Sequence, residues 1–207
     1  MLEWIIRGGP MMIPILLCSV AALAIILERF MYLQKIKLDT KKFMSEVSDS
    51  LNRNRAMDAI NICEQMPGPL PNVLKAGILK YDRTRQEIKE AVEDAALHEI
   101  PRMERNISIL ATIAHISTLL GLLGTVIGMI EVFQKIQEKS AALSPVTPAD
   151  LSAGIWQALI ATAAGLIVAI PTITAYNYFV SRVNNFILQM EISATDLVNI
   201  LSEKKVE

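Results

Sequence analysis

Three long stretches of the chain contain no acidic or basic residue. They cover residues 8–27, 106–130 and 151–181, with lengths of 20, 25 and 31 residues, and the charged residues are confined to the rest of the chain. A helix needs about 20 apolar residues to cross the hydrocarbon core of a bilayer. The pattern therefore predicts an all-α integral membrane protein with transmembrane helices at 10–33, 106–132 and 151–180. It argues against an ordinary soluble enzyme.

The first stretch also has features of a signal peptide. A short segment ending at Arg7 precedes the apolar run, and Ala22-Leu23-Ala24 resembles a cleavage site. The run nevertheless continues to Leu27 and stops at Glu28, which makes it longer than the roughly 7–15 apolar residues of a signal peptide. We therefore expect an uncleaved transmembrane anchor.

Positive residues are distributed unevenly between the two sides that three spans define. Of the 20 Lys and Arg residues, 17 lie in the loop after the first span and in the C-terminal tail. Lys and Arg near span ends accumulate on the cytoplasmic side. The distribution predicts an N-terminus outside the cell at 1–9, a cytoplasmic helical loop at 34–105, an external loop at 133–150 and a cytoplasmic C-terminal helix or tail at 181–207.

The long polar loop has the pattern of a series of helices. A first helix is expected from Asp39 or Thr40, both good N-caps, to about Gln65, followed by a proline-rich break at 67–71 and a short helix at 72–81. Thr84 and Glu87 have the spacing of a capping box. From there the sequence contains no strong stop until about residue 136, so we expect one long helix that Pro101 kinks without ending. These long helices would extend from the membrane into the cytoplasm.

Small residues form one face of the predicted helix after Thr84. This face packs either against a neighbouring copy or against the chain's own helix at 39–65, and the sequence leaves both open. Its members are Ile88, Ala91, Val92, Ala95 and Ala96. Before the third span, Thr147 is the expected N-cap, Pro148 the first helical residue, and Asp150 a favourable charge in the first turn.

Motifs for covalent, metal or nucleotide chemistry are missing from the sequence. Gly121-Leu122-Leu123-Gly124 lacks the Lys and Ser/Thr of a phosphate-binding loop, and Cys and His residues have no metal-ligand spacing. We therefore expect no enzyme activity, no metal and no cofactor. The net charge of −1 and the lack of a basic stripe argue against nucleic acid as a partner. Cys18 within a span and Cys63 in the polar loop do not suggest a disulfide.

The second and third spans each carry a stripe of small residues that includes threonine. In the second span, Ala111, Ala114, Thr118, Gly121, Thr125 and Gly128 share one sector of the helix, and Gly124 and Gly128 have small-x-x-x-small spacing. In the third, Ile155, Ala158, Thr162, Gly165, Leu166 and Ala169 share a face. The stripes fit either dry helix packing or the lining of a narrow polar interior. Pro171 should free the carbonyl of Ile167, with Thr172 and Thr174 as candidates to satisfy it.

The spans contain few groups that can carry charge. In the three uncharged stretches, His115 is the single side chain that titrates near neutral pH, and it is either a neutral donor to a neighbouring helix or a proton relay. Gln157 is expected to be an interhelical hydrogen-bond donor. Because the three uncharged stretches lack Asp and Glu, a proton-driven complex would need a carboxylate from another chain, with this chain as the threonine-lined housing.

Three stretches of the chain resemble one family, the MotA/TolQ/ExbB proton-channel superfamily in its three-span ExbB/TolQ branch. The stretches read GGPMMIPILL at 8–17, LLGLLGTVIGMI at 119–130 and GIWQALIATAAGLIVAIP at 154–171. The resemblance extends from end to end of the chain and favours an ExbB-like member. It does not distinguish H⁺ from Na⁺ as the driving ion.

The resemblance implies a homo-oligomer, typically a pentamer, in a bacterial inner membrane. Its central pore would hold the helices of a single-span partner that resembles ExbD or TolR, whose aspartate would lie near Thr125 and Thr162. The assembly would do work on a periplasm-spanning protein resembling TonB or TolA. The expected ion pathway or pore lining comprises Thr118, Thr125, Thr162, Gln157 and His115, and the expected helix-packing positions are Gly121, Gly124, Gly128, Gly165 and Pro171.

One position departs from the family pattern. Well-studied members have a glutamate where this chain has Gln157, so the resemblance gives no titratable role to that residue. The alternative functions are a TolQ-like rather than an ExbB-like role, or a passive oligomeric scaffold that gathers a partner protein. In that case the threonines would be dispensable, whereas bulky residues at Gly124 or Gly128 would disrupt oligomers.

Overall fold

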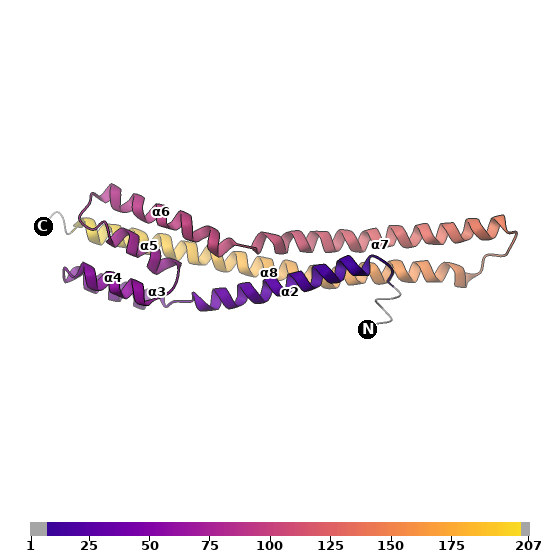
Figure 1. The fold of residues 1–207 in the computed structure, drawn as a ribbon, viewed down its shortest axis with the longest axis horizontal. Coiled ribbons are helices and arrows are strands. Elements are labelled where there is room, and N and C mark those ends of the chain that lie inside the picture. The colour runs from indigo at the N-terminus through magenta and orange to yellow at the C-terminus, as the bar shows by residue number, and fades with distance from the viewer. Residues whose placement is uncertain (1–7, 204–207) are drawn as a thin grey trace. The chain divides into compact units, whose positions relative to one another are not determined.

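The computed structural model describes residues 8–203 and the side chains of residues 8–202; the first seven residues of the expected periplasmic N-terminus and the last four of the tail lie outside this range. All regular secondary structure in the described range is helical (Figure 1). The helices are α2 (Met12–Lys35), α3 (Thr40–Asn52), α4 (Ala56–Gln65), α5 (Pro69–Ile78), α6 (Arg85–Glu104), α7 (Ile107–Ala141) and α8 (Pro148–Glu203).

Three helical segments have the length and composition to cross a membrane, which confirms the predicted class of all-α membrane protein. Inside the chain itself, only 17%, 28% and 33% of the residues in their most apolar windows are buried. Large apolar side chains such as Leu17, Leu119 and Ile167 are exposed. An apolar surface this extensive is untenable in water, so it has to be covered by lipid or by other chains.

The chain divides into two compact units, which are described separately. The apolar unit consists of Met1–Leu27 and Asn106–Tyr178, and the polar unit consists of Glu28–Arg105 and Phe179–Glu207. Helices α2 and α8 each contribute to both units.

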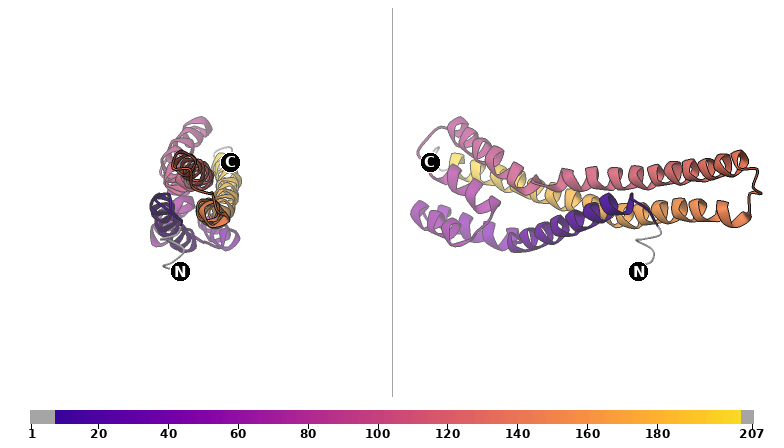
Figure 2. Two further views of the ribbon diagram at one scale, coloured as in Figure 1. Left: turned by 90° about the vertical axis from the view of Figure 1, so that its right-hand side faces the viewer. Right: turned by 45° about the vertical axis from the view of Figure 1, so that its right-hand side comes forward.

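In the apolar unit, α7 and the first part of α8 lie side by side in opposite directions, as the views of Figures 1 and 2 agree. Glycines from both helices bring the backbones together: a Cβ atom on Gly165 would lie 2.5 Å from the carbonyl oxygen of Ser117, and one on Gly128 would lie 2.7 Å from that of Gly154. A Cβ on Gly121 would lie 3.2 Å from the Cα of Thr162. We call this contact the glycine seam, and its glycines are Gly121, Gly124, Gly128, Gly154 and Gly165.

The core of the polar unit is formed by α3, α4, α5, α6 and the C-terminal part of α8. Its fully buried side chains include Phe43, Val47, Leu74, Ile78, Ile88, Val183 and Leu197. Gly77 of α5 allows a close approach, because a Cβ there would lie 2.6 Å from Val92 of α6 and 3.0 Å from Leu197 of α8. Ile88 and Val92 on the small-residue face of α6 therefore pack against α5 and α8. Neither partner considered from the sequence, the helix at 39–65 or another copy, accounts for this contact.

Several helix starts follow the sequence prediction. Asp39 caps α3 by accepting a hydrogen bond from the backbone N–H of Lys42. Thr84 and Glu87 form the expected capping box, in which each side chain accepts from the backbone N–H of the other residue. Helix α5 begins at Pro69, earlier than the predicted 72, because proline is well tolerated in the first turn of a helix.

Two predicted continuous helices are interrupted, so those predictions are wrong. The helix at 39–65 is divided between α3 and α4 at Asn54, which has φ of 60°. The long helix from Thr84 ends at Glu104, and Asn106, with φ of 61°, separates α6 from α7. Asparagine is among the non-glycine residues that most readily adopt the left-handed conformation. Pro101 lies within α6 and does not end it, as expected.

Arg29 helps to explain the break after α6. Its side chain is only 3% exposed, and its Nη1 donates to the carbonyl oxygen of Arg102 in the last turn of α6, at 3.3 Å. The Nη2 atom pairs with Glu28 at 2.6 Å, and the guanidinium lies 5.1 Å from the ring centroid of Tyr32. A cation is favourable at a helix C-terminus because carbonyl groups there carry negative partial charge. Arg29 thus stabilises the end of α6.

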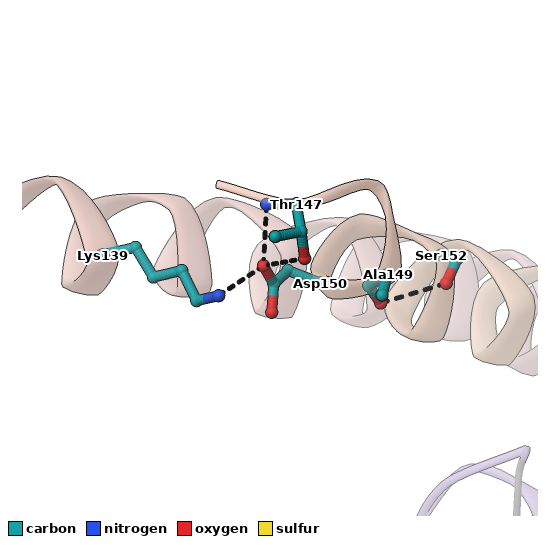
Figure 3. Close-up of polar contacts among 5 residues, drawn as sticks. All are labelled: Lys139, Thr147, Ala149, Asp150 and Ser152. Atoms are coloured by element: carbon teal, nitrogen blue, oxygen red, sulfur yellow. Dashed lines mark hydrogen bonds and ion pairs between the residues drawn. The ribbon is translucent and has the colours of Figure 1, made fainter. Parts of the chain in front are cut away.

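The turn between α7 and α8 is fixed by one carboxylate (Figure 3). Asp150 Oδ2 accepts from Lys139 Nζ at 2.5 Å, from the Thr147 hydroxyl at 2.6 Å and from the Thr147 backbone N–H at 2.8 Å. The Lys139 ammonium and the two Thr147 donors hold the pKa of Asp150 far below its usual range. Pro148 begins α8 as predicted, whereas α7 continues to Ala141, so two thirds of the loop predicted at 133–150 is helical.

We predict that Gly165→Ala destabilises the apolar unit. The added Cβ would clash with the backbone of Ser117, and overpacking of this kind costs about 1–3 kcal/mol. The free energy of unfolding is measured by SDS titration of the full-length protein in mixed micelles. Ala163→Val, on an exposed position of the same helix, is the control and should leave the protein as stable as the wild type. Wild-type stability in Gly165→Ala would contradict the glycine seam.

We also predict a pH-dependent effect of Asp150→Asn. Because folding lowers the pKa of Asp150, its carboxylate stabilises the folded state fully above the unfolded-state pKa of about 3.9. That stabilisation is lost progressively as the pH falls below this value towards the folded-state pKa. Thermal unfolding should therefore show a stability gap between wild type and variant at neutral pH that narrows below about pH 4. Glu138→Gln is the control; a gap that does not change with pH would contradict the account.

Candidate functional site

Polar side chains follow the glycine seam between α7 and α8. Thr162 of α8 donates its hydroxyl hydrogen across the seam to the carbonyl oxygen of Gly121 on α7, at 2.9 Å. The bond is possible because Gly121 has no side chain to separate the two backbones. Thr162 is half-buried. The hydroxyl therefore links the two helices and retains its lone pairs as acceptors.

Thr118 and Thr125 lie on one face of α7, two helical turns apart. The Thr125 hydroxyl donates to the carbonyl of Leu122 at 2.6 Å, and that of Thr118 donates to the carbonyl of Ala114 at 3.0 Å. Thr125 is half-buried and Thr118 is exposed, so both lie at the edge of the seam. Thr162, bound to Gly121, lies one turn of α7 away from Thr125.

Gln157 is an interhelical hydrogen-bond donor, the role favoured by the sequence. Its Nε2 lies 3.1 Å from Oε1 of Glu131 on α7. The N-terminal segment also packs against the amide: Gly9 has φ of +73°, and a Cβ atom there would lie 2.5 Å from Gln157 Nε2. Three segments of the apolar unit thus meet at Gln157.

Sequence reasoning missed Glu131 because it directly follows the uncharged stretch at 106–130. Helical periodicity could have indicated this residue, because Glu131 lies seven residues after Gly124 and three after Gly128, on the same face of the helix. This face continues the glycine seam, and Glu131 is half-buried there. The chain therefore brings a carboxylate of its own to the level of Gln157.

The remaining predicted positions lie away from these contacts. His115 is exposed, and its Nδ1 lies 2.8 Å from the carbonyl oxygen of Ala111 in its own helix, not in a neighbouring one. Pro171 is also exposed. Thr172 and Thr174 donate to the carbonyls of Val168 and Ile170, so neither takes up the carbonyl of Ile167 as had been expected.

Ser117 is a second residue whose environment could not be predicted from the sequence. Its side chain is fully buried on α7, and its backbone carbonyl lies against Gly165. Within residues 8–202, its hydroxyl has no hydrogen-bond partner. A polar group without a partner is costly inside an apolar environment.

The seam offers hydroxyl, amide and carboxylate groups, which suit hydrogen bonding and the binding of a proton or a cation. Over the residues that the structure describes, no three His, Cys, Asp or Glu side chains gather as a metal site would require. The thiol of Cys63 lies in the polar unit, where burial raises its pKa to about 11 and keeps it protonated. The polar groups of the seam are thus the main candidates for function.

Comparison with known proteins agrees with this architecture. Residues 65–192, which include α7 and most of α8, match the MotA/TolQ/ExbB proton channel family. The chain is 29% identical to the putative biopolymer transport protein ExbB homolog of Methanothermobacter thermautotrophicus, over 92% of this chain and 67% of that protein. It is 30% identical to the putative biopolymer transport protein ExbB-like 3 of Synechocystis sp., over 83% and 81% respectively. It is also 30% identical to the Tol-Pal system protein TolQ of Haemophilus influenzae, over 80% and 76%. The chain belongs to the MotA/TolQ/ExbB proton channel family.

Proposed function

We propose that this chain is the channel-forming subunit of an energy-transducing complex in a bacterial inner membrane. With a single-span partner that resembles ExbD or TolR, it uses the proton gradient to do work on a periplasm-spanning protein that resembles TonB or TolA. Family membership over residues 65–192 supports the proposal, as do relatives named for biopolymer transport and for the Tol-Pal system.

The observation that carries the proposal is the pairing of α7 and α8 through glycines with threonines along the contact. Thr162 bonds to Gly121 across the seam, and Thr125 lies at its edge one turn further along α7. A hydroxyl group both donates and accepts hydrogen bonds, so it can stabilise a proton carrier or a carboxylate that passes by. A partner aspartate at the level of Thr125 and Thr162 would meet such groups.

The proposed arrangement in the membrane follows the distribution of charge. The N-terminus and the α7–α8 turn lie in the periplasm, and the polar unit with the C-terminus lies in the cytoplasm, because 17 of the 20 Lys and Arg residues fall on that side. A proton that crosses this membrane releases about 2.3 kcal/mol per 100 mV of potential, which is the source of the work.

We further propose a homo-oligomer, with a pentamer as the specific assembly, around the partner's helices. The extensive exposed apolar surface of α2, α7 and α8 supports contacts with lipid and with neighbouring copies. Gly124 and Gly128 contact α8 of the same chain, so bulky residues there would test the fold of the subunit and not only its oligomerisation.

The proposal predicts that Thr162→Val and Thr125→Val assemble normally and lose proton transport. Valine keeps the shape of threonine but cannot hydrogen-bond, and loss of a positioned proton-transfer group reduces a rate by about 100-fold or more. Proton flux is measured in vesicles that contain the full-length chain and its single-span partner, with a membrane potential imposed.

Thr112→Val is the matched control for this experiment. Thr112 is also on α7 and donates its hydroxyl hydrogen to a carbonyl of its own helix, but it is exposed and away from the seam. Its variant should transport at the wild-type rate. If both seam variants are also as active as the wild type, the passive scaffold becomes the better description.

A further inference from the structure

Glu131 lies at the end of the glycine seam nearest the α7–α8 turn, directly after the uncharged stretch at 106–130. We propose that Glu131, oriented by Gln157, is the group with which this chain itself binds the transported proton on the way between the turn and the threonines. The inference rests on the proposed function and adds to it an acid that belongs to this chain.

Helical periodicity places Glu131 in the seam. It is half-buried and shares a face of α7 with Gly124 and Gly128. Its neighbour Val132 is 5% exposed and lies against Gly154, where a Cβ atom would be 2.5 Å from Val132 Cγ2. The Glu131 side chain therefore projects from α7 at a point where α7 and α8 are in direct contact.

The side chain of Gln157 contacts two other segments of the apolar unit. The Gly9 backbone packs on the amide, and Glu131 Oε1 accepts a hydrogen bond from Nε2 at 3.1 Å. The NH₂ group of the Gln157 amide is the donor in this bond, and the Glu131 oxygen is the acceptor. Gln157 thus fixes the direction of one carboxylate oxygen, which makes it a positioning residue.

The chemistry of the pair limits proton exchange to one member. An amide does not titrate, so the proton that arrives and leaves at this point binds a carboxylate oxygen of Glu131 and returns to water, with no other bond changed. Among charged groups on the adjoining elements, Lys135 lies one turn further along α7, and α8 has none between residues 151 and 181. The segment before Gly8 lies outside the described residues.

The position of the pair suits an intermediate step. Glu131 lies six residues beyond Thr125 on α7, or about 9 Å along the axis, and Gln157 lies five residues before Thr162 on α8, or about 7.5 Å. In the opposite direction, Lys139, Thr147 and Asp150 mark the turn. The carboxylate is therefore between the turn and the threonines.

The test compares the full-length wild type with Glu131→Gln and with the exchange variant Glu131→Gln/Gln157→Glu. Each is reconstituted with the single-span partner into phosphatidylethanolamine/phosphatidylglycerol vesicles that contain a pH-sensitive dye, and proton flux is measured under an imposed potential. In Glu131→Gln the two amides can still hydrogen-bond, so a merely structural pair would survive this change. The exchange variant restores one carboxylate and one amide at these two positions, with the two residues interchanged.

We expect Glu131→Gln to reduce proton flux by about 100-fold or more, the usual scale for loss of a positioned proton-transfer group, and the exchange variant to restore most of it. Glu138→Gln, an exposed carboxylate on the same helix, should transport normally. Wild-type flux in Glu131→Gln, or a loss that the exchange does not restore, would overturn the inference while leaving the proposed function intact. If the wild type itself carries no more flux than protein-free vesicles, the proposed function fails and the inference fails with it.

Discussion

The close approach of α7 and α8 is the constraint on which the rest of the apolar unit depends. Inside a bilayer, helices gain no hydrophobic free energy by associating, so the contact has to come from van der Waals packing and interhelical hydrogen bonds. Gly121 and Gly165 let the backbones approach, and that approach brings the Thr162 hydroxyl within reach of a carbonyl on the facing helix. The Gln157–Glu131 bond depends on the same proximity. The same close approach therefore determines both the packing of this helix pair and the hydrogen bonds between its side chains and backbone.

Asp150 and Arg29 are charged residues whose partners lie at helix ends. Asp150 accepts hydrogen bonds from Lys139 and Thr147 at the start of α8. Arg29 donates a hydrogen bond to a carbonyl in the last turn of α6, within the polar unit. Charges at such termini also interact favourably with the helix dipole. Within each unit, these contacts fix where a helix begins or ends, which in turn sets the register of the residues along it.

Features that depend on local sequence could be predicted, and those that depend on tertiary contacts could not. The three apolar helices and the caps at Asp39 and Thr84 follow from composition and spacing over a few residues. The breaks at Asn54 and Asn106 do not, because asparagine adopts the left-handed conformation only where surrounding contacts favour it, and nothing local indicates that Arg29 reaches the end of α6. The small-residue face of α6 likewise does not show from its sequence that its partners are α5 and α8.

For the candidate site, the sequence indicated the threonines and Gln157 but not how they are paired. Thr162 contacts the facing helix, whereas Thr125 bonds within its own helix, a difference that periodicity alone does not show. Glu131 was not predicted because it directly follows the uncharged stretch at 106–130, although it lies on the same helical face as the glycines. The end of an apolar stretch is thus a place where a functional carboxylate is easily overlooked.

The central claim is that the threonine edge of the α7–α8 pair faces a water-accessible path and not lipid. It is tested most directly by cysteine accessibility in the full-length chain with Cys18 and Cys63 replaced by serine. A small cationic methanethiosulfonate reagent is applied to Thr125→Cys and to Leu119→Cys, which is on an exposed apolar face of the same helix. The account predicts modification at position 125 and none at position 119. If the cysteine at 125 is as unreactive as the one at 119, the account is contradicted.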